Sequence, residues 1–226
     1  MANHGKRWRT DQDKVPAAPV SVQEAVQCLL GFQKTKFDQT VELVLNLGID
    51  PRQAEQALRG SVSLPHGVGG SKKVIAFCEG PDIEAAKAAG AVDAGGEDLV
   101  KKVQDGWLDF DVAIATPAMM RLVSRLGRVL GPQGKMPSPK SGTVTPDIAQ
   151  AVGEFSAGKL EYRNDSGGNV QVPIGKMSFD AAKLAENAEF FIEHMRRRKP
   201  STAKGTYFKK VFITATMTPS VPVEVH

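Results

Sequence analysis

The sequence contains little of what most metal and redox chemistry requires. Its 226 residues include two cysteines and four histidines, and 6% of them are aromatic. Cys28 and Cys78 lie far apart in apolar surroundings and form neither a CxxC pair nor a zinc-binding spacing. We expect both to be buried free thiols, which suits a reducing compartment, and we predict no cofactor and no metal.

Long apolar runs are also missing. None approaches the roughly 20 residues of a membrane-spanning helix. The basic start, MANHGKRWRT, is not followed by an apolar segment, so no signal peptide is predicted. We therefore expect a cytoplasmic protein with no membrane partner, whose first residues, roughly 1–20, form a mobile polar lead.

The short motifs of common enzymes are absent as well. Lys135 follows Gly134 as in a phosphate-binding loop, but Val129 and Met136 replace the required Gly and Ser/Thr. No GxGxxG opens a helix, and neither GxSxG nor HExxH occurs. We predict that the protein is not an enzyme. An enzyme that holds a nucleotide on an α/β domain is the alternative, since an active site can combine residues distant in sequence.

The composition is that of a globular protein, with 41% hydrophobic and 24% charged residues, enough for one large domain or two modest ones. The net charge of +4 is unevenly spread. Residues 68–158 carry a net −1, residues 1–67 a net +1 and residues 159–226 a net +4. The densest basic run is 196–210, which fits either a solvated helix end or a contact with a polyanion.

The middle of the chain alternates strand and helix patterns. Apolar runs predict strands over 73–77, 91–92 and 111–116, and helical spacing predicts helices over 81–90, 96–106, 117–127 and 146–158. This order is typical of a parallel sheet with helices on both faces.

The two ends of the chain have a different pattern. Ser21 and Glu24 form a capping box before a helix, and residues 40–49 alternate as a half-buried strand. The sequence also predicts a short helix capped by Asp50 and a strand over 61–65. Further along it predicts a hairpin over 159–175, a helix from 178 to 198 capped by Ser178, and a strand over 206–217. We predict an α/β fold of two domains: a discontinuous one from 1–67 and 159–226, and an inserted one from 68–158.

A purely cationic loop, GRVLGPQGKMPSPKSGTVT, occupies residues 127–145. Its glycines and prolines predict an open loop that neither helix nor strand absorbs. The loop resembles a segment of the ribosomal protein L-one family of the large subunit. Five other segments resemble that family in the same order along the chain: KFDQTVELVLNLGIDPRQAEQALRGSVSLPHG, EAAKAAGA, YRND, AKGTYFKKV and TATMTPS. The resemblance covers roughly residues 6–221.

The resemblance implies a discontinuous RNA-binding domain with split βαβ-like topology and an inserted Rossmann-like domain that needs no nucleotide. It implies binding to large-subunit rRNA at the mobile stalk beside the tRNA exit site, and a part in moving and releasing deacylated tRNA. In bacteria it further implies repression of the protein's own operon mRNA. These are the partners we expect.

Matching motifs also imply the RNA-binding residues, which are Lys36, Phe37, Thr40, Glu42, Arg163, Asp165, Thr214, Thr216, Met217 and Thr218. Basic groups can contact phosphates, and threonine and carboxylate groups can bond 2′-hydroxyls. Phe37 and Met217 would pack on sugars or bases, although without the resemblance each would more often be a core residue.

Three positions depart from the family pattern. Thr218 stands where the family usually has Gly, Gln133 replaces an Arg, and Lys135 replaces an apolar residue. A Cβ at 218 either is tolerated by the turn or keeps RNA at a distance. For the cationic loop we expect a secondary RNA contact, or a contact with the other domain, through Arg128, Lys135 and Lys140.

Overall fold

The computed structural model describes residues 5–225, which divide into two compact units. Unit 1 takes the residues up to 59, 64–69 and those from 162 onward; unit 2 takes 60–63 and 70–161. The second unit is therefore inserted into the first in sequence. The bounds of two independently folding domains stay a prediction.

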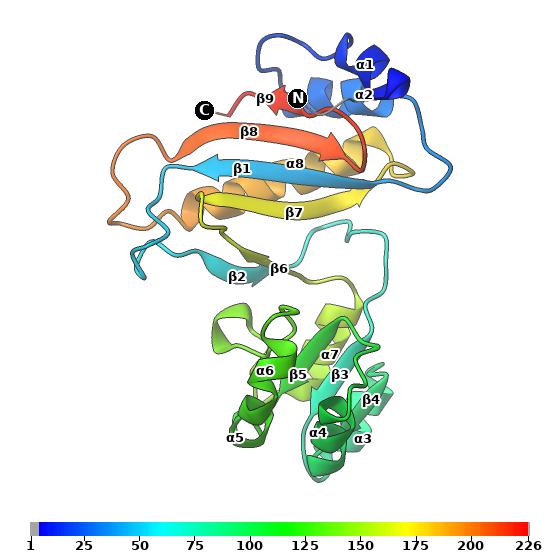
Figure 1. Cartoon of the computed structure of the whole chain (residues 1–226), viewed down its shortest axis with the longest axis vertical. Helices are drawn as coiled ribbons and strands as arrows, with labels where there is room; N and C mark the ends of the chain where they lie inside the picture. The colour runs from blue at the N-terminus through cyan, green and yellow to red at the C-terminus, as the bar shows by residue number, and fades with distance from the viewer. Residues whose placement is uncertain (1–4, 226) are drawn as a thin grey trace. The chain divides into compact units, whose positions relative to one another are not determined.

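Unit 1 is built on an antiparallel sheet, and two of its helices, α2 (Val22–Leu30) and α8 (Ala181–Arg197), pack together against one face (Figure 1). The strand order is β7 (Asn169–Lys176), β1 (Thr40–Leu47), β8 (Phe208–Ala215) and β9 (Val221–Val223). The helices are α1 (Lys6–Gln12), α2 (Val22–Leu30) and α8 (Ala181–Arg197). Odd-numbered residues of β1 are buried and even-numbered ones half-buried, so alternation places one face of the strand in the core and leaves an outer face.

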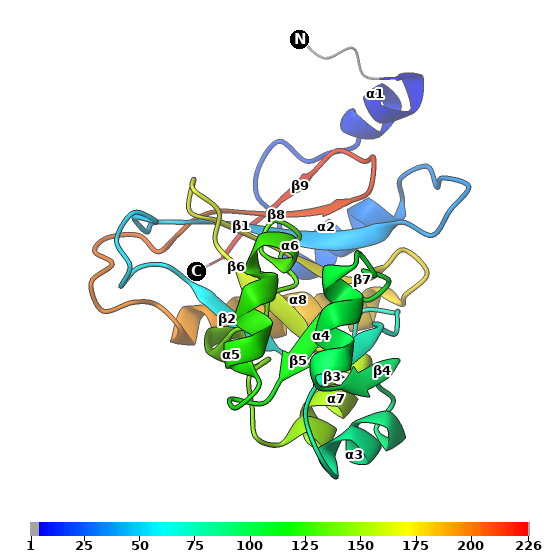
Figure 2. The same ribbon diagram turned by 60° about the horizontal axis from the view of Figure 1, so that its bottom comes forward.

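Unit 2 contains a parallel sheet between two apolar layers. Its strands are β4 (Asp93–Gly95), β3 (Val74–Phe77) and β5 (Val112–Ala115), in that order. The helices are α3 (Asp82–Ala88), α4 (Glu97–Gln104), α5 (Met120–Val123), α6 (Gly127–Leu130) and α7 (Ile148–Ser156). Val74 and Ala76 pack with α3 and α7, whereas Ile75 and Phe77 pack with α4 and α5. Figure 2 shows α4 on one side of this sheet and α3 and α7 on the other.

The predicted fold class is confirmed: the chain combines an antiparallel sheet with a separate parallel one. A third sheet has two strands, β2 (Arg59–Val62) and β6 (Leu160–Arg163), at the points where the chain passes between the units. The capping box at Ser21 is also confirmed, because its hydroxyl accepts from Glu24 N and the Glu24 carboxylate accepts from Ser21 N, both at 3.3 Å.

The prediction of a mobile lead over residues 1–20 is wrong for the described part of that stretch. Residues 6–12 form α1, and Asp11 is only 1% exposed. Its carboxylate accepts from the backbone N–H of Gln33 at 3.2 and 3.3 Å. A buried carboxylate is tolerated because it is paired in this way, and the pairing fixes the helix to the rest of unit 1.

Several predicted element boundaries are also wrong. Asp50 caps no helix: its backbone O and N bond within turns, to Gln53 N and Gln56 Oε1. Helix α8 begins at Ala181 rather than after Ser178, whose hydroxyl donates to Asp38 at 2.8 Å instead. The predicted 61–65 strand lies at 59–62, and the predicted 91–92 strand at 93–95.

The predicted hairpin and the predicted third helix of unit 2 are only partly right. Residues 164 and 170 form a single antiparallel bridge, but β6 pairs with β2 and β7 with β1, so the two strands enter different sheets. The 117–127 helix is split into α5, a 3-10 turn (η1, Ser124–Leu126) and α6, which extends to Leu130 inside the cationic loop.

Candidate nucleic-acid interface

Two loops meet at one end of the unit 1 sheet, and most of the predicted RNA-binding residues lie there. The loop that precedes β1 carries Lys36 and Phe37, and the turn that follows β8 carries Thr216, Met217 and Thr218. Strand β1 pairs antiparallel with β8, so its start lies beside the end of β8, with Val41 opposite Ala215. We call the loop 33–39 and the turn 215–218 the paired loops.

The apolar side chains of the paired loops are exposed. Phe37 is 50% exposed and Met217 67% exposed. The alternative that they are core residues is therefore wrong. Because folding gains nothing from leaving large apolar groups in water, such groups gathered at one end of a sheet are typical of a contact surface.

Buried polar bonds fix the paired loops to each other. Gln39 is 1% exposed; its Nε2 donates to Thr216 O at 2.6 Å and its Oε1 accepts from Thr35 N at 3.4 Å. The N–H of Thr216 donates to Thr40 O at 3.0 Å. Sequence reasoning missed Gln39, because a polar residue between exposed loop positions gives no sign that its amide will be buried.

The outer face of the sheet supplies polar groups next to these loops. Glu42 lies opposite Thr214 across the β1–β8 pair, and Thr40 precedes it on the same face. Lys176 of β7 donates to Thr40 Oγ1 at 2.8 Å. Lys176 thus adds a cation that the sequence motifs did not indicate, although its place at the end of the 169–175 pattern next to a turn is a usable signal.

The turn at Thr218 accommodates a side chain. The backbone of Met217 has φ 65°, while Thr218 itself does not have a positive φ. The Thr218 hydroxyl accepts from Ala215 N and donates to Ala215 O, each at 3.0 Å. Thr218, at the position where the resemblance leads us to expect Gly, therefore closes its own turn with its hydroxyl, and its neighbour Met217 adopts the left-handed conformation.

Arg163 and Asp165 lie at the other end of β1. They adjoin the start of β7, where Asn169 pairs with Asn46, about 20 Å along the strand from Thr40 at roughly 3.3 Å per residue. The Asp165 carboxylate accepts from Gly167 N at 2.8 Å and from Asn169 N and Nδ2 at 2.7 and 2.9 Å. Bonds from the Asn169 side chain, and then from its backbone, lower the pKa of Asp165. Arg163 is exposed.

The cationic loop belongs to unit 2 and is bonded to it. The ammonium of Lys135 donates to Leu108 O at 3.1 Å and to Phe110 O at 2.6 Å, and it lies 5.0 Å from the Phe110 ring centroid. Arg128 and Lys140 are exposed. Further along, Ser141 is buried, and Ser138 N donates to Thr143 Oγ1 at 2.8 Å. The expectation of an open loop is thus wrong, because its own side chains and its helical first turn order it.

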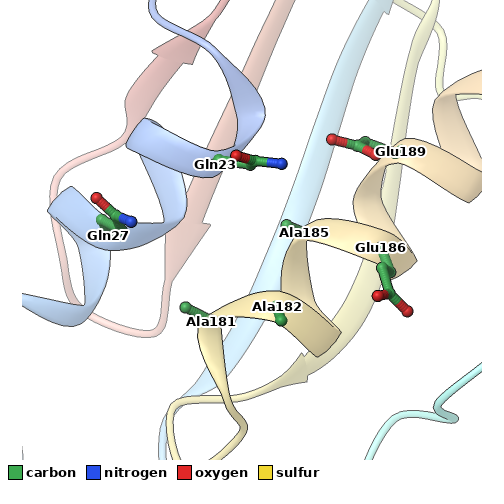
Figure 3. Close-up of a pocket in the computed structure, with 7 residues that line it drawn as sticks. All are labelled: Gln23, Gln27, Ala181, Ala182, Ala185, Glu186 and Glu189. Atoms are coloured by element: carbon green, nitrogen blue, oxygen red, sulfur yellow. The ribbon is translucent and has the colours of Figure 1, made fainter.

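A groove between α2 and α8 offers a different environment (Figure 3). It is lined by Gln23, Gln27, Ala181, Ala182, Ala185, Glu186 and Glu189. Its only charged groups are two carboxylates, so it repels phosphates. Among residues 5–225, no three His, Cys, Asp or Glu side chains are placed to hold a metal ion. Cys78 is buried as predicted, Cys28 is only half-buried, and both are free. No helix in that range has the length and hydropathy to cross a membrane.

Comparison with known proteins decides the family. A family model described as "Ribosomal protein L1p/L10e family" matches residues 29–219. The chain belongs to the ribosomal protein L1p/L10e family. Two relatives, both called large ribosomal subunit protein uL1, support this. The one from Lactobacillus gasseri is 50% identical over 99% of this chain and 98% of its own length. The one from Streptococcus gordonii is 52% identical over 100% and 99%.

The family model spans both units, because its match begins within α2 and ends just after the turn at Thr218. It therefore includes both paired loops, β1, Arg163, Asp165 and the cationic loop. The predicted membership in the L1p/L10e family is confirmed.

Proposed function

We propose that this protein is a structural component of the large ribosomal subunit that binds large-subunit rRNA at its mobile stalk, as a cytoplasmic part of the ribosome. Family membership and the relatives' names support the assembly. The observation that supports the interface is the exposed pair Phe37 and Met217 beside the polar outer face of β1.

Each group at this interface has a chemical task. Lys36 contacts phosphates and Phe37 stacks on a base or sugar, with Met217 giving further apolar contact. Thr40, Glu42, Thr214 and Thr216 bond 2′-hydroxyls and base edges, which lets the surface tell RNA from DNA. Arg163 contacts the RNA backbone farther along the sheet. Asp165 shapes its own turn, and Thr218 shapes the turn that carries Met217.

The unit 2 loop has a smaller part in the proposal. Arg128 and Lys140, which are exposed, are the groups we propose for a secondary phosphate contact. The ammonium of Lys135 already donates to two backbone oxygens, so we propose that it holds the loop rather than binds RNA.

The test is binding to a short stalk rRNA fragment, with a scrambled RNA as control, at two salt concentrations. We expect tight binding to the stalk fragment alone, weakening as salt rises. Phe37→Ala should raise Kd by about 5- to 150-fold, since stacking on one base contributes ~1–3 kcal/mol. Phe190→Ala is the matched control, because Phe190 is 43% exposed but lies on α8.

Two outcomes would count against the proposal. Equal binding of both RNAs would argue against specific rRNA recognition and reopen the nucleotide-binding enzyme as the alternative. An equal loss of affinity from Phe37→Ala and Phe190→Ala would exclude the outer face of β1 as the interface.

We further propose two activities that depend on the same RNA site. On the ribosome the protein assists movement and release of deacylated tRNA at the exit site, and off the ribosome it represses its own operon by binding the mRNA. The second is tested by competition between the mRNA leader and the stalk fragment for the wild type and Phe37→Ala. If the leader does not displace the stalk fragment, the repressor role is excluded.

A further inference from the structure

A single guanidinium joins the paired loops. Arg7 of α1 donates through Nη1 to Gln33 O at 3.2 Å and through Nη2 to Met217 O at 2.8 Å. One acceptor begins the loop that leads to Phe37, and the other is the backbone of the exposed methionine. Since α1 lies outside the matched family segment, which starts at residue 29, neither the family match nor the RNA-binding motifs assign it a role.

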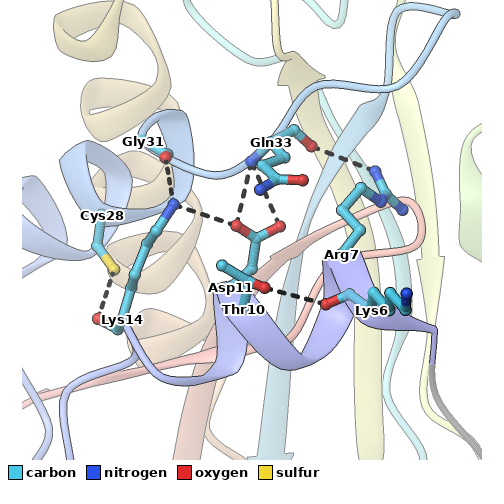
Figure 4. Close-up of polar contacts among 8 residues, drawn as sticks. All are labelled: Lys6, Arg7, Thr10, Asp11, Lys14, Cys28, Gly31 and Gln33. Carbon is cyan, nitrogen blue, oxygen red and sulfur yellow. Dashed lines mark hydrogen bonds and ion pairs between the residues drawn. The ribbon is translucent and has the colours of Figure 1, made fainter.

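Helix α1 is anchored independently of Arg7. Figure 4 shows Asp11 and Lys14 beside the 31–33 segment, with Arg7 reaching the carbonyl of Gln33. The Asp11 carboxylate accepts from Gln33 N, and the Lys14 ammonium donates to Asp11 at 3.3 Å and to Gly31 O at 3.3 Å. The helix therefore stays on this segment without Arg7, and the Arg7 side chain extends from a fixed base to the turn 215–218.

The acceptor on that turn belongs to a strained residue. Met217 is the only residue other than glycine with positive φ among residues 5–225, and its side chain is 67% exposed. A left-handed conformation in a residue other than glycine persists only where the surrounding structure stabilises it. The exposed side chain of Met217 has too little packing to do so. The hydroxyl of Thr218 holds one side of the turn through Ala215, and Arg7 holds the Met217 carbonyl.

We propose that Arg7 is a positioning residue for RNA binding: it clamps loop 33–39 and turn 215–218 in the arrangement that presents Phe37 and Met217 together. This rests on the function proposed above. Apparent affinity falls in proportion to the fraction of molecules that hold the binding arrangement. Without the clamp Gln39 still holds Thr216, but the Met217 peptide next to it samples other conformations, and affinity falls although no RNA contact has been removed.

Direct contact between Arg7 and a phosphate is the competing explanation, and salt separates the two. The plot of log K against log salt has a negative slope. A lost phosphate contact makes that slope shallower by about 0.7–0.9, whereas lost positioning leaves it unchanged. Arg9 provides the matched control, because it lies on the same helix, is exposed and carries the same charge.

The experiment compares wild type, Arg7→Gln, Arg7→Lys and Arg9→Gln in the full chain, with the stalk rRNA fragment and its scrambled control. We expect Arg7→Gln to raise Kd about tenfold and Arg9→Gln to change it by less than about twofold. The dependence of log K on log salt should have the same slope in both variants. Arg7→Lys keeps the charge but cannot fork to two carbonyls, so it should be intermediate. Any of three results would overturn the proposal: equal changes in Kd for Arg7→Gln and Arg9→Gln, a shallower salt slope for Arg7→Gln alone, or wild-type RNA affinity in Arg7→Lys.

A second measurement needs no RNA and so separates this inference from the proposed function. The Thr218 N–H donates to Ala215 O at 3.0 Å within the clamped turn. Its hydrogen exchange should accelerate in Arg7→Gln and not in Arg9→Gln, while the thermal unfolding of both stays near wild type. Unchanged Thr218 exchange in Arg7→Gln would overturn the clamp even if the wild type binds stalk rRNA. Accelerated exchange in a protein that does not discriminate the two RNAs would keep the clamp and reject its function.

Discussion

Removing the side chain of Asn187 should destabilise unit 1 more than any surface asparagine does. Asn187 is fully buried in α8; its Oδ1 accepts from His66 N at 3.2 Å, and its Nδ2 donates to Gly67 O at 3.0 Å and to Ile174 O at 2.8 Å. The carbonyl of Ile174 is in the core, whereas His66 and Gly67 lie in a partly exposed segment of the same unit. Asn187→Ala strands one buried acceptor and two groups that water can reach.

The expected magnitude follows from that difference. A stranded buried group costs about 1–3 kcal/mol, and a lost bond that water can replace about 0.5–1 kcal/mol. The sum for Asn187→Ala is about 2–5 kcal/mol, or a fall in Tm of roughly 7–18 °C at about 3.5 °C per kcal/mol for a unit of this size. Such a loss is large for one substitution, because most surface changes stay within about 0.5 kcal/mol.

The assay should follow unit 1 alone. Trp8 lies in unit 1 and Trp107 in unit 2, so urea unfolding monitored by fluorescence in a Trp107→Phe background reports the first unit. Asn46→Ala is the control, since Asn46 is half-buried and its Nδ2 bonds another side chain, Asn169 Oδ1, at 2.6 Å. We expect it to cost less than about 1 kcal/mol. If Asn187→Ala costs no more than Asn46→Ala, the three bonds do not stabilise the unit and the reasoning fails.

Three further predictions concern single side chains. Lys135→Ala should lower the stability of unit 2 by about 1–2 kcal/mol in urea, because Phe110 O loses its donor while Leu108 O keeps the Phe110 N–H. Lys140→Ala should change it by less than about 0.5 kcal/mol, and equal effects would contradict the internal role of Lys135. Met217→Gly should leave unit 1 as stable as before or up to about 1 kcal/mol more stable, because glycine removes the strain of positive φ, while RNA affinity falls; a clear loss of stability would show that φ 65° carries no strain. The lowered pKa of Asp165 predicts stabilisation that is present above about pH 4, the ordinary pKa, and lost as pH falls through the folded value, so Asp165→Asn should flatten the acid limb of a stability–pH curve; an unchanged limb would refute it.

The sequence predicted those elements whose signal is local. The Ser21–Glu24 box and the alternation of β1 each specify a bonding pattern within a few residues, and both occur in the structure. The strands and helices of the inserted segment were predicted for the same reason, apart from boundary shifts and the 117–127 helix, which is split. The RNA-binding role of the two exposed loops was predicted from long motifs and not from hydrophobic periodicity. Local periodicity cannot show that Phe37 and Met217 lie outside the core.

Three of the failures share a different cause, which is a partner distant in sequence. Asp11 reads as a surface residue until its bond to Gln33 is known, and Ser178 reads as a helix cap until Asp38 competes for its hydroxyl. The 159–175 hairpin failed because β7 finds a better partner in β1 than in β6. The clamp of Arg7 on Met217, 210 positions away in sequence, is beyond any local pattern for the same reason.

The order of the strands has a consequence for biosynthesis. The central strand of the unit 1 sheet, β1, is made early, but its neighbours β7 and β8 follow only after the whole of unit 2. Chains grow at about 5–20 residues per second, and domains generally fold as units while the chain emerges. Unit 2 can therefore fold while β1 still has both edges unpaired, and the apolar face of that strand stays exposed for several seconds. Because of this insertion, β1 needs protection by the ribosome or by a chaperone during synthesis, before the protein has folded and can bind RNA.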